Sequence, residues 1–163
     1  LATLLTCCLL VCVVPSQGQD CKSTNTEAWK AVSGPGGGNL WLLRSTSSSA
    51  RKCVSVEAPN ESEGSWTEKK LKMKYKSESQ GKTVEKELPV TANGNELKTT
   101  VGGNDVTAQL LFDNDKCFVT KSPLGVDLWQ HSSEGNTPNE CCKKEFEKQS
   151  EGKGTEDLQS GCS

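Results

Sequence analysis

The stretch CFVTKSPLGVDLWQHSSEGNTPNECC, residues Cys117–Cys142, does most to determine how this chain folds. Two short strand-like runs, Lys116–Lys121 and Val126–His131, precede a turn-rich bridge and the start of a helix with two adjacent cysteines. Neighbouring side chains on a helix point about 100° apart, so Cys141 and Cys142 are expected to have different partners. Each cysteine would then tie the helix to a different part of the protein.

The second strand-like run places unlike residue types on one face. With the period of two of a β-strand, Asp127, Trp129 and His131 share a face. The apolar Val126 and Leu128 lie on the other face. An acid, an indole and an imidazole together indicate either the wall of a small-molecule pocket or a solvated strand edge. We interpret His131 as a solvated residue at the end of the strand.

The first eighteen residues have the character of a secretory signal peptide. They carry no charge, are mostly apolar up to Val14, and are interrupted by Pro15. The apolar run is too short to span a bilayer, and the small residues Ser16 and Gly18 suit a cleavage site. We therefore predict a signal peptide at residues 1–18, without its basic start, and a secreted, extracellular domain at residues 19–163 with no membrane-spanning segment.

Cysteine usage agrees with secretion. Beyond the predicted signal peptide the chain has six cysteines, an even set that favours three disulfides in an oxidising compartment. Zinc binding is a weak alternative, because there is no C-x-x-C pair and His131 is the only histidine. We expect neither a metal nor a cofactor.

The composition predicts one domain with a modest core. Hydrophobic residues make up 33% of the chain and the mean hydropathy is −0.59, so cross-links or a closed sheet must contribute to stability. The net charge of −2, with both signs interspersed, argues against nucleic acid as a partner. The sequon that begins at Asn60 lies in a polar loop and predicts a glycan there.

The remaining chain has the pattern of a mainly β protein. Leu71, Met73 and Tyr75 alternate with lysines, which predicts one face toward an apolar interior and a solvated outer face rather than a polyanion site. Eight short strands joined by tight turns indicate an up-and-down barrel or a sandwich. Apart from the two runs already named, the predicted strands are Asn39–Thr46, Arg51–Glu57, Trp66–Lys76, Lys82–Val90, Glu96–Val101 and Val106–Phe112.

Two helices are predicted, one near each end of the mature chain. The first covers Thr24–Val32, with Thr24 or Thr26 as its N-cap. The second covers Pro138–Lys148, with the proline near its first turn.

In the order and spacing of these features the chain resembles the tick salivary lipocalins. This family contains histamine-binding proteins and soft-tick relatives that bind leukotrienes or inhibit complement, and the resemblance covers essentially the whole predicted mature chain. The matching segments are Glu27–Lys30 (EAWK), Leu43–Thr46 (LRST), Ala50–Cys53 (ARKC), Cys117–Val119 (CFV), Asp127–Trp129 (DLW) and Asn139–Cys142 (NECC).

The resemblance implies a fold and a disulfide pattern. The fold is an eight-stranded antiparallel barrel with a short N-terminal helix and a C-terminal helix packed outside it, around one ligand cavity. The implied pairs are Cys21–Cys141, Cys53–Cys162 and Cys117–Cys142. This pattern gives the two adjacent cysteines different partners.

The amine-binding members of the family suggest one set of ligand-binding residues. A protonated amine in a dry cavity requires carboxylates and benefits from aromatic faces. In the resemblance, Asp127 stands for a glutamate of those members, and Trp129 follows it as in them. Phe118 stands where they have an aspartate, so an apolar ring replaces a charge. Asp127 could instead be an outward acid or the ion-pair partner of a lysine.

The eicosanoid-binding branch suggests a second set. There an arginine before the second cysteine and the eighth-strand tryptophan hold a fatty-acid carboxylate, and Arg51 and Trp129 match those positions. Arginine can bind a carboxylate through two hydrogen bonds where lysine cannot. Lys116, beside the third mature cysteine, is a candidate to assist. The alternative is that Arg51 is a surface residue at the start of a strand.

The expected function is binding rather than catalysis. We expect a monomeric protein that sequesters a small host inflammatory mediator, either an eicosanoid such as a leukotriene or a biogenic amine such as histamine or serotonin, with Phe118 favouring the lipid. The alternative is that its loops bind a host protein, such as a complement or haemostasis factor. No nucleophile, metalloprotease or phosphate-binding motif supports an enzyme.

Overall fold

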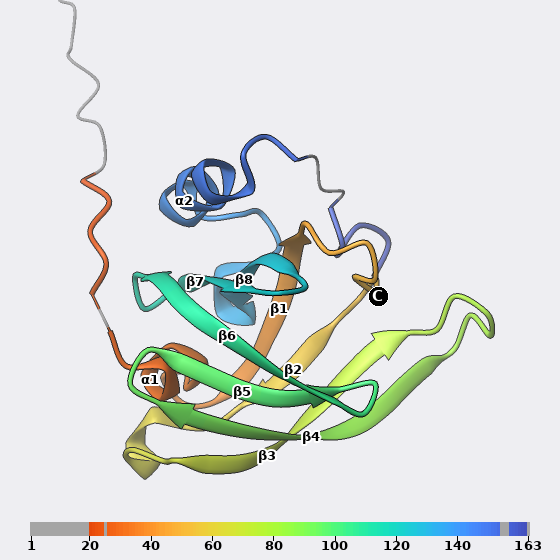
Figure 1. Cartoon of the computed structure of the whole chain (residues 1–163), viewed down its shortest axis with the longest axis horizontal. Helices are drawn as coiled ribbons and strands as arrows, with labels where there is room; N and C mark the ends of the chain where they lie inside the picture. The colour runs from red at the N-terminus through yellow and green to blue at the C-terminus, as the bar shows by residue number, and fades with distance from the viewer. Residues whose placement is uncertain (1–19, 25, 154–156, 163) are drawn as a thin grey trace, which may run out of the picture.

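The computed structural model describes residues 20–24, 26–153 and 157–162 of the chain. Its centre is a closed barrel of eight antiparallel strands, each hydrogen-bonded to the next, with β1 closing the ring on β8 (Figure 1). The prediction of a mainly β fold is confirmed, and of its two forms the barrel is correct. The predicted signal peptide lies outside the described residues.

The elements follow the predicted order. The strands are β1 (Gly38–Ser45), β2 (Ser55–Ala58), β3 (Glu68–Lys76), β4 (Thr83–Asn93), β5 (Glu96–Val101), β6 (Asn104–Asp113), β7 (Cys117–Ser122) and β8 (Gly125–His131). The helices are α1 (Ala28–Val32) and α2 (Glu140–Ser150), with single 3₁₀ turns η1 (Glu61–Glu63) and η2 (Ser132–Glu134). In the described part of the chain no helix is long and apolar enough to cross a membrane.

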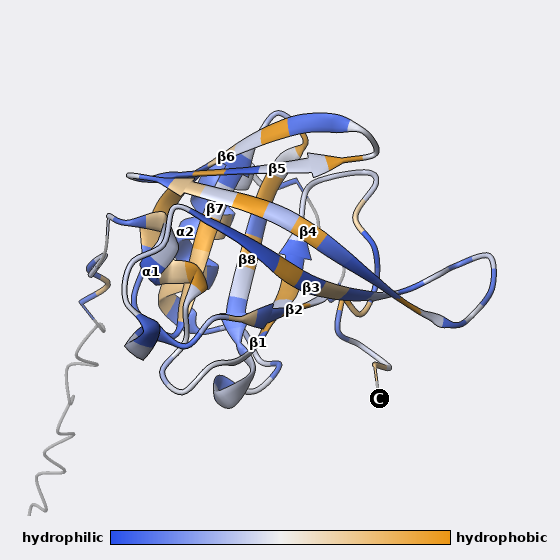
Figure 2. Ribbon diagram, turned by 90° about the horizontal axis from the view of Figure 1, so that it is seen from below, coloured by the Kyte–Doolittle hydropathy of each residue, from blue (hydrophilic) through white to orange (hydrophobic). Residues whose placement is uncertain are grey.

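Strand β3 has the two faces that its alternating sequence predicts. Leu71 and Tyr75 are buried, and Lys70, Lys72, Lys74 and Lys76 are exposed. The ribbon of β3 is accordingly mostly hydrophilic with hydrophobic positions between (Figure 2). Lys74 Nζ lies 3.4 Å from a carboxylate oxygen of Glu85 on the neighbouring strand. The predicted solvated outer face is therefore confirmed, and ion pairs to neighbouring strands cross it.

Strand β2 is shorter than predicted. It begins at Ser55 rather than at Arg51, because Cys53 has a left-handed backbone (φ 58°) that no regular strand accepts. The N–H of Cys53 donates instead to the carbonyl of Leu158, and its sulfur is bonded to Cys162. Arg51 therefore lies in the loop between β1 and β2.

The predicted starts of both helices are wrong. Helix α1 begins at Ala28 with Glu27 at its N-cap, and Thr24 Oγ1 donates to the carbonyl of Asp113 instead of capping the helix. Helix α2 begins at Glu140, and the side chain of Asn139 caps it by accepting a hydrogen bond from the N–H of Cys141. Pro138 therefore lies just before the N-cap rather than in the first turn of the helix.

Helix α1 lies across one end of the barrel, beside the turn between β4 and β5 (Figure 1). Its residues Ala31 and Val32 join Leu40 and Trp66 in an apolar cluster that fills this end. The indole N–H of Trp66 donates to the hydroxyl of Ser33 at 3.0 Å. This end, here called the closed end, is therefore sealed by side chains.

Helix α2 packs on the outside of the barrel, against β7 and β8. Leu43, Val119, Leu128 and Phe146 form a buried cluster between the helix and the outward faces of the strands. The disulfides have the pairing that the resemblance implies, Cys21–Cys141, Cys53–Cys162 and Cys117–Cys142. Two of them hold α2, one to the N-terminal segment and one to β7. Three disulfides fit an oxidising compartment.

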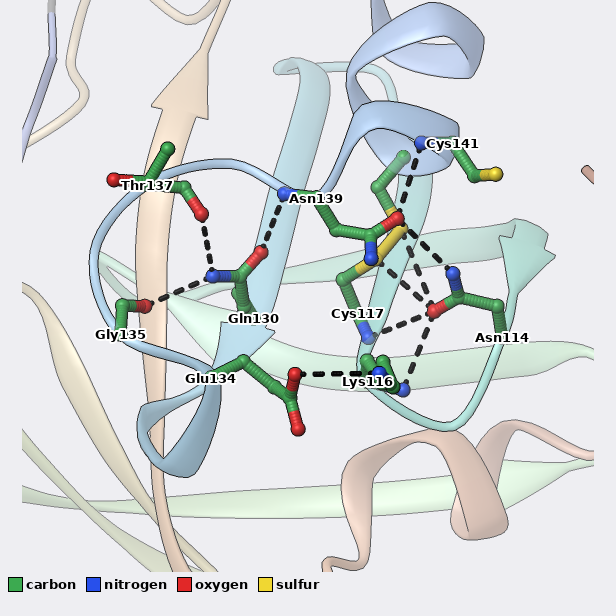
Figure 3. Close-up of polar contacts among 10 residues, drawn as sticks. Asn114, Lys116, Cys117, Gln130, Glu134, Gly135, Thr137, Asn139 and Cys141 are labelled. Carbon is green, nitrogen blue, oxygen red and sulfur yellow. Dashed lines mark hydrogen bonds and ion pairs between the residues drawn. A yellow bond between two sulfur atoms is a disulfide. The ribbon is translucent and has the colours of Figure 1, made fainter. Parts of the chain in front are cut away.

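Amide side chains also hold α2 to the barrel, with Gln130 buried at the centre of their hydrogen bonds (Figure 3). The Nε2 of Gln130 donates to the carbonyls of Gly135 and Thr137 at 2.8 and 2.9 Å, and its Oε1 accepts from the N–H of Asn139 at 2.8 Å. Asn114 donates through Nδ2 to Oδ1 of Asn139 at 3.1 Å. The bridge between β8 and α2 is therefore fixed by hydrogen bonds rather than by regular structure.

Candidate functional site: the barrel cavity

A cavity of about 220 Å³ occupies the barrel interior. Val32 of α1 bounds it at the closed end, and inward side chains of all eight strands form its walls. Most of the lining is apolar. Its carboxyl and hydroxyl groups belong to Asp127, Thr99, Thr120 and Ser122. An enclosed apolar space with a few placed polar groups is typical of a small-molecule site.

The cavity opens at the end opposite α1. There it joins an outer compartment of about 390 Å³, and Asp127, Trp129, Met73 and Leu88 line both. The ladder between β4 and β5 reaches only to the pair Val90 and Thr99, since the next residue, Pro89, has no N–H to donate. The strands consequently separate toward this end, here called the mouth.

Asp127 is held inside by the register of β8 against β1. It pairs with Ser45, because a bulge at Leu43 shifts the register between Leu42 and Arg44. The Ser45 hydroxyl donates to the carboxylate of Asp127. Asp127 therefore points into the cavity, and the idea that it is an outward acid or a lysine partner is wrong.

The electrostatic environment of Asp127 is unusual. No basic side chain among the described residues forms an ion pair with it, and burial raises the pKa of its carboxyl above the ordinary value of 3.8. The hydrogen bond from Ser45 opposes this shift but is the smaller effect. The site thus holds a half-buried acid that lacks a compensating cation in the described part of the chain.

Two aromatic rings lie beside this carboxylate. Phe118 on β7 pairs across the ladder with Trp129 on β8, and the rings are stacked with centroids 6.3 Å apart and planes inclined by 15°. Phe118 faces inward, as expected for the neighbour of the outward Cys117. The structure therefore brings Asp127, Trp129 and Phe118 together on one wall of the cavity.

Arg51 lies at the mouth, in the loop between β1 and β2. Its guanidinium carbon is 4.5 Å from the centroid of the Tyr75 ring, and Lys86 Nζ is 6.0 Å from the same centroid. All three residues line the outer compartment together with Asp127. Arg51 is exposed, yet it is fixed over an aromatic ring at the entrance rather than placed at random on the surface.

Lys116 is not brought to the cavity. It precedes β7 at the closed end, where its Nζ lies 3.6 Å from a carboxylate oxygen of Glu134 in η2 (Figure 3). It lines neither the cavity nor the outer compartment. The structure therefore gives Lys116 a surface ion pair and no position to assist Arg51.

The prediction that His131 is solvated is wrong. Its side chain is only 5% exposed, and Nε2 lies 3.3 Å from the carbonyl oxygen of Ala31 in α1. The chain at Gly34 crosses so closely that a β-carbon there would be 2.9 Å from the ring nitrogen Nδ1. Burial lowers the pKa of His131 below its ordinary value of 6.5. His131 supports the closed end rather than the binding wall.

Sequence reasoning missed Tyr75 and Thr99 as functional candidates. The sequence placed Tyr75 in the apolar interior, and it does face inward. Its ring also contacts the guanidinium group of Arg51 at the mouth. Thr99 is one of the alternating residues of β5, and its position between Leu97 and Val101 would have marked it as inward-facing. The alternation of residues in β5 therefore indicated that Thr99 faces inward. Threonine is too common in strands, however, to be singled out as a functional residue.

The remaining sequence predictions concern a glycan at Asn60 and metal binding. Asn60 is half-buried at the start of η1, where its side chain accepts a hydrogen bond from the N–H of Ser62. Glycosylation there stays a prediction. Among the described residues no group of three His, Cys, Asp or Glu side chains is placed to hold a metal ion.

Comparison with known proteins supports the same kind of site. No protein-family model matches the chain. Its fold is similar to the crystal structure of the AM182 serotonin complex, with a TM-score of 0.68 and 26% sequence identity over 85% of this chain and 94% of that one. Taken with the closed eight-stranded barrel, this likeness fits a lipocalin. Such a barrel indicates a small-ligand-binding protein.

Proposed function

We propose that this protein is a secreted binding protein that sequesters a small aromatic amine, of the serotonin or histamine kind, in its barrel cavity. The observation that carries the proposal is Asp127, a carboxylate inside the barrel with no ion-pair partner among the described residues. A protonated amine would supply the missing charge. Phe118 and Trp129 would supply aromatic faces beside it.

Size and comparison favour the amine over the lipid. The inner cavity of about 220 Å³ is below the usual range of roughly 300–1,000 Å³ for drug-sized ligands, so it suits a small ring system better than a long acyl chain. An acyl chain would also lie against the uncompensated carboxylate of Asp127, which is costly. The similar structure of AM182 contains serotonin. The sequence favoured a lipid because Phe118 replaces an acid. In the structure the ring of Phe118 instead extends the aromatic wall formed by Trp129.

An acidic lipid remains a second candidate because of Arg51. Its guanidinium at the mouth could bind a carboxylate while the acyl chain enters the cavity, and Lys86 is close enough to add a second positive charge. For such a ligand the Asp127 carboxyl would take up a proton, which its raised pKa makes easier. Leukotrienes are the ligand class that this arrangement would suit.

Calorimetric titration of the oxidised protein distinguishes these candidates. Wild type, Asp127→Asn and Arg51→Ala are each titrated with serotonin, histamine and a leukotriene. Glu85→Gln is the matched control, because it removes one negative charge from the outer face of the barrel. We expect Asp127→Asn to weaken amine binding by roughly 10- to 150-fold, the worth of a charged hydrogen bond of about 1.5–3 kcal/mol. Glu85→Gln should leave it unchanged.

Two results would change the proposal. Amine binding that survives Asp127→Asn would refute the role of the carboxylate. Leukotriene binding that is weakened by Arg51→Ala, again by about 1.5–3 kcal/mol, would establish the second candidate instead. Binding of neither class would shift attention to the loops and a host protein.

The biological setting is also part of the proposal. Three disulfides suit an extracellular protein, and the resemblance to tick salivary lipocalins suggests removal of host inflammatory mediators at a feeding site. Sequestration requires only tight binding of one ligand per barrel and no catalysis.

A further inference from the structure

The inner face of β5 carries a single hydroxyl group, that of Thr99, between the apolar Leu97 and Val101. Its Oγ1 is buried and has no hydrogen-bond partner in the part of the chain that the structure describes. The residues paired with Thr99 in the barrel are Val90 on β4 and Val106 on β6, and neither side chain can form a hydrogen bond. Because Thr99 lines the cavity but its Oγ1 has almost no accessible surface in the empty barrel, a ligand reaches this hydroxyl through a small shift of the Thr99 side chain.

Packing alone gives no reason for a hydroxyl at this position. A buried polar atom without a partner costs about 1–3 kcal/mol, whereas valine has nearly the same shape and carries no such cost. The neighbouring inward positions Val90, Val101 and Val106 show that valine fits this wall. An oxygen that the protein itself does not use is best explained by a ligand group that does.

Thr99 lies on the wall that faces the carboxylate. In the order of the closed barrel, β5 and β8 are separated by β6 and β7, so Thr99 and Asp127 line the same cavity from facing sides. A ligand whose ammonium group reaches Asp127 and whose ring lies beside Trp129 can extend its far end across the cavity toward β5. There the unpaired oxygen of Thr99 can accept or donate one hydrogen bond.

We propose that Thr99 is a specificity-determining residue that recognises a hydroxyl on the ring of the bound amine, at the end away from the ammonium group. The inference rests on the proposed function and narrows its ligand class to hydroxylated aromatic amines. An amine without the ring hydroxyl leaves the Thr99 oxygen unpaired and binds more weakly. Discrimination of this kind is strongest where a buried polar group of the site would otherwise lack a partner.

Titration of two related ligands into wild type and single-residue variants tests this role of Thr99. Serotonin and tryptamine differ by the ring hydroxyl, and each is titrated into wild type, Thr99→Val, Thr99→Ser and the control Thr91→Val, an exposed residue of β4 that lines neither the cavity nor the outer compartment. In wild type we expect serotonin to bind about threefold to tenfold more tightly than tryptamine, the range of one neutral hydrogen bond. This ratio should fall to about one in Thr99→Val and persist in Thr99→Ser and Thr91→Val.

The outcomes separate this inference from the proposed function. If both amines bind and Asp127→Asn abolishes their binding, but Thr99→Val keeps the preference for serotonin, the role of Thr99 is refuted and the proposed function stands. Equal affinities in wild type also refute it. If neither amine binds, the proposed function and the inference fall together. A melting temperature of Thr99→Val at or above that of wild type shows that the variant is folded.

Discussion

The carboxylate of Asp127 should make the ligand-free protein less stable, so Asp127→Asn should raise the free energy of unfolding at neutral pH. The asparagine side chain can still accept the hydrogen bond from Ser45, and its volume is almost unchanged. The substitution therefore removes little except a negative charge that burial disfavours and that no cation in the described chain offsets.

The size of this effect follows from the position of the side chain. Asp127 is half-buried at the junction of the cavity and the outer compartment, so water still solvates part of the charge. We expect a gain of about 0.5–1.5 kcal/mol, the lower part of the range for stabilising changes at functional positions. For a domain of this size the gain corresponds to a rise in melting temperature of roughly 1–6 °C.

The dependence on pH identifies the carboxyl as the cause. Because the pKa of Asp127 is raised in the folded state, the folded protein holds a proton that the unfolded chain releases between pH 3.8 and the raised value. The free energy of unfolding of the wild type therefore falls as pH rises through this window. The advantage of Asp127→Asn should be largest above the window and disappear below pH 3.8.

Urea unfolding of both proteins, with disulfides intact, across a series of pH values measures this difference. Glu85→Gln again serves as the control, because its carboxylate is exposed and paired with Lys74. The reasoning is refuted if Asp127→Asn is less stable than wild type at pH 7, or if the difference between the two proteins does not change with pH. Either result would mean that the protein itself compensates the charge.

Two further predictions concern the closed end and the C-terminal segment. Burial lowers the pKa of His131, so as pH falls below 6.5 the unfolded chain binds a proton that the folded protein does not. The free energy of unfolding should therefore fall in this range. Melting curves at pH 7.5 and 5 should show the loss in wild type and a smaller loss in His131→Gln. Replacing both Cys53 and Cys162 by alanine removes a link between residues 109 positions apart, and denaturant titration should show a loss of about 2–5 kcal/mol, whereas an unchanged midpoint would mean that the bond adds no stability.

The fold was largely predictable because its signals are local and periodic. The alternation of Leu71, Met73 and Tyr75 with lysines requires a strand with one wet and one dry face, and the structure has it. The same period of two predicted that Asp127 and Trp129 share a face, which is the face toward the cavity. Tight turns between such strands indicated an up-and-down barrel or a sandwich, and the structure has the closed barrel.

The parts that could not be predicted depend on contacts between distant residues. His131 looks solvated by its position at a strand end, and only the approach of Ala31 and Gly34, about a hundred residues away, buries it. Arg51 looks like a strand residue until Cys53 is turned into a left-handed conformation by its links to the C-terminal segment. Whether a hydroxyl such as that of Thr99 finds a partner is likewise invisible in the sequence.

The low hydrophobic content of the chain and its binding site have one common explanation. A barrel that keeps its interior open for a ligand cannot also fill that interior with a core, so stability must come from elsewhere. Here it comes from the closed end around Trp66, from the cluster beneath α2 around Phe146, and from three disulfides. With the walls fixed from outside, the interior can tolerate an uncompensated acid at Asp127 and an unpaired hydroxyl at Thr99. Both are unfavourable in the empty protein, and one hydroxylated amine would relieve both at once.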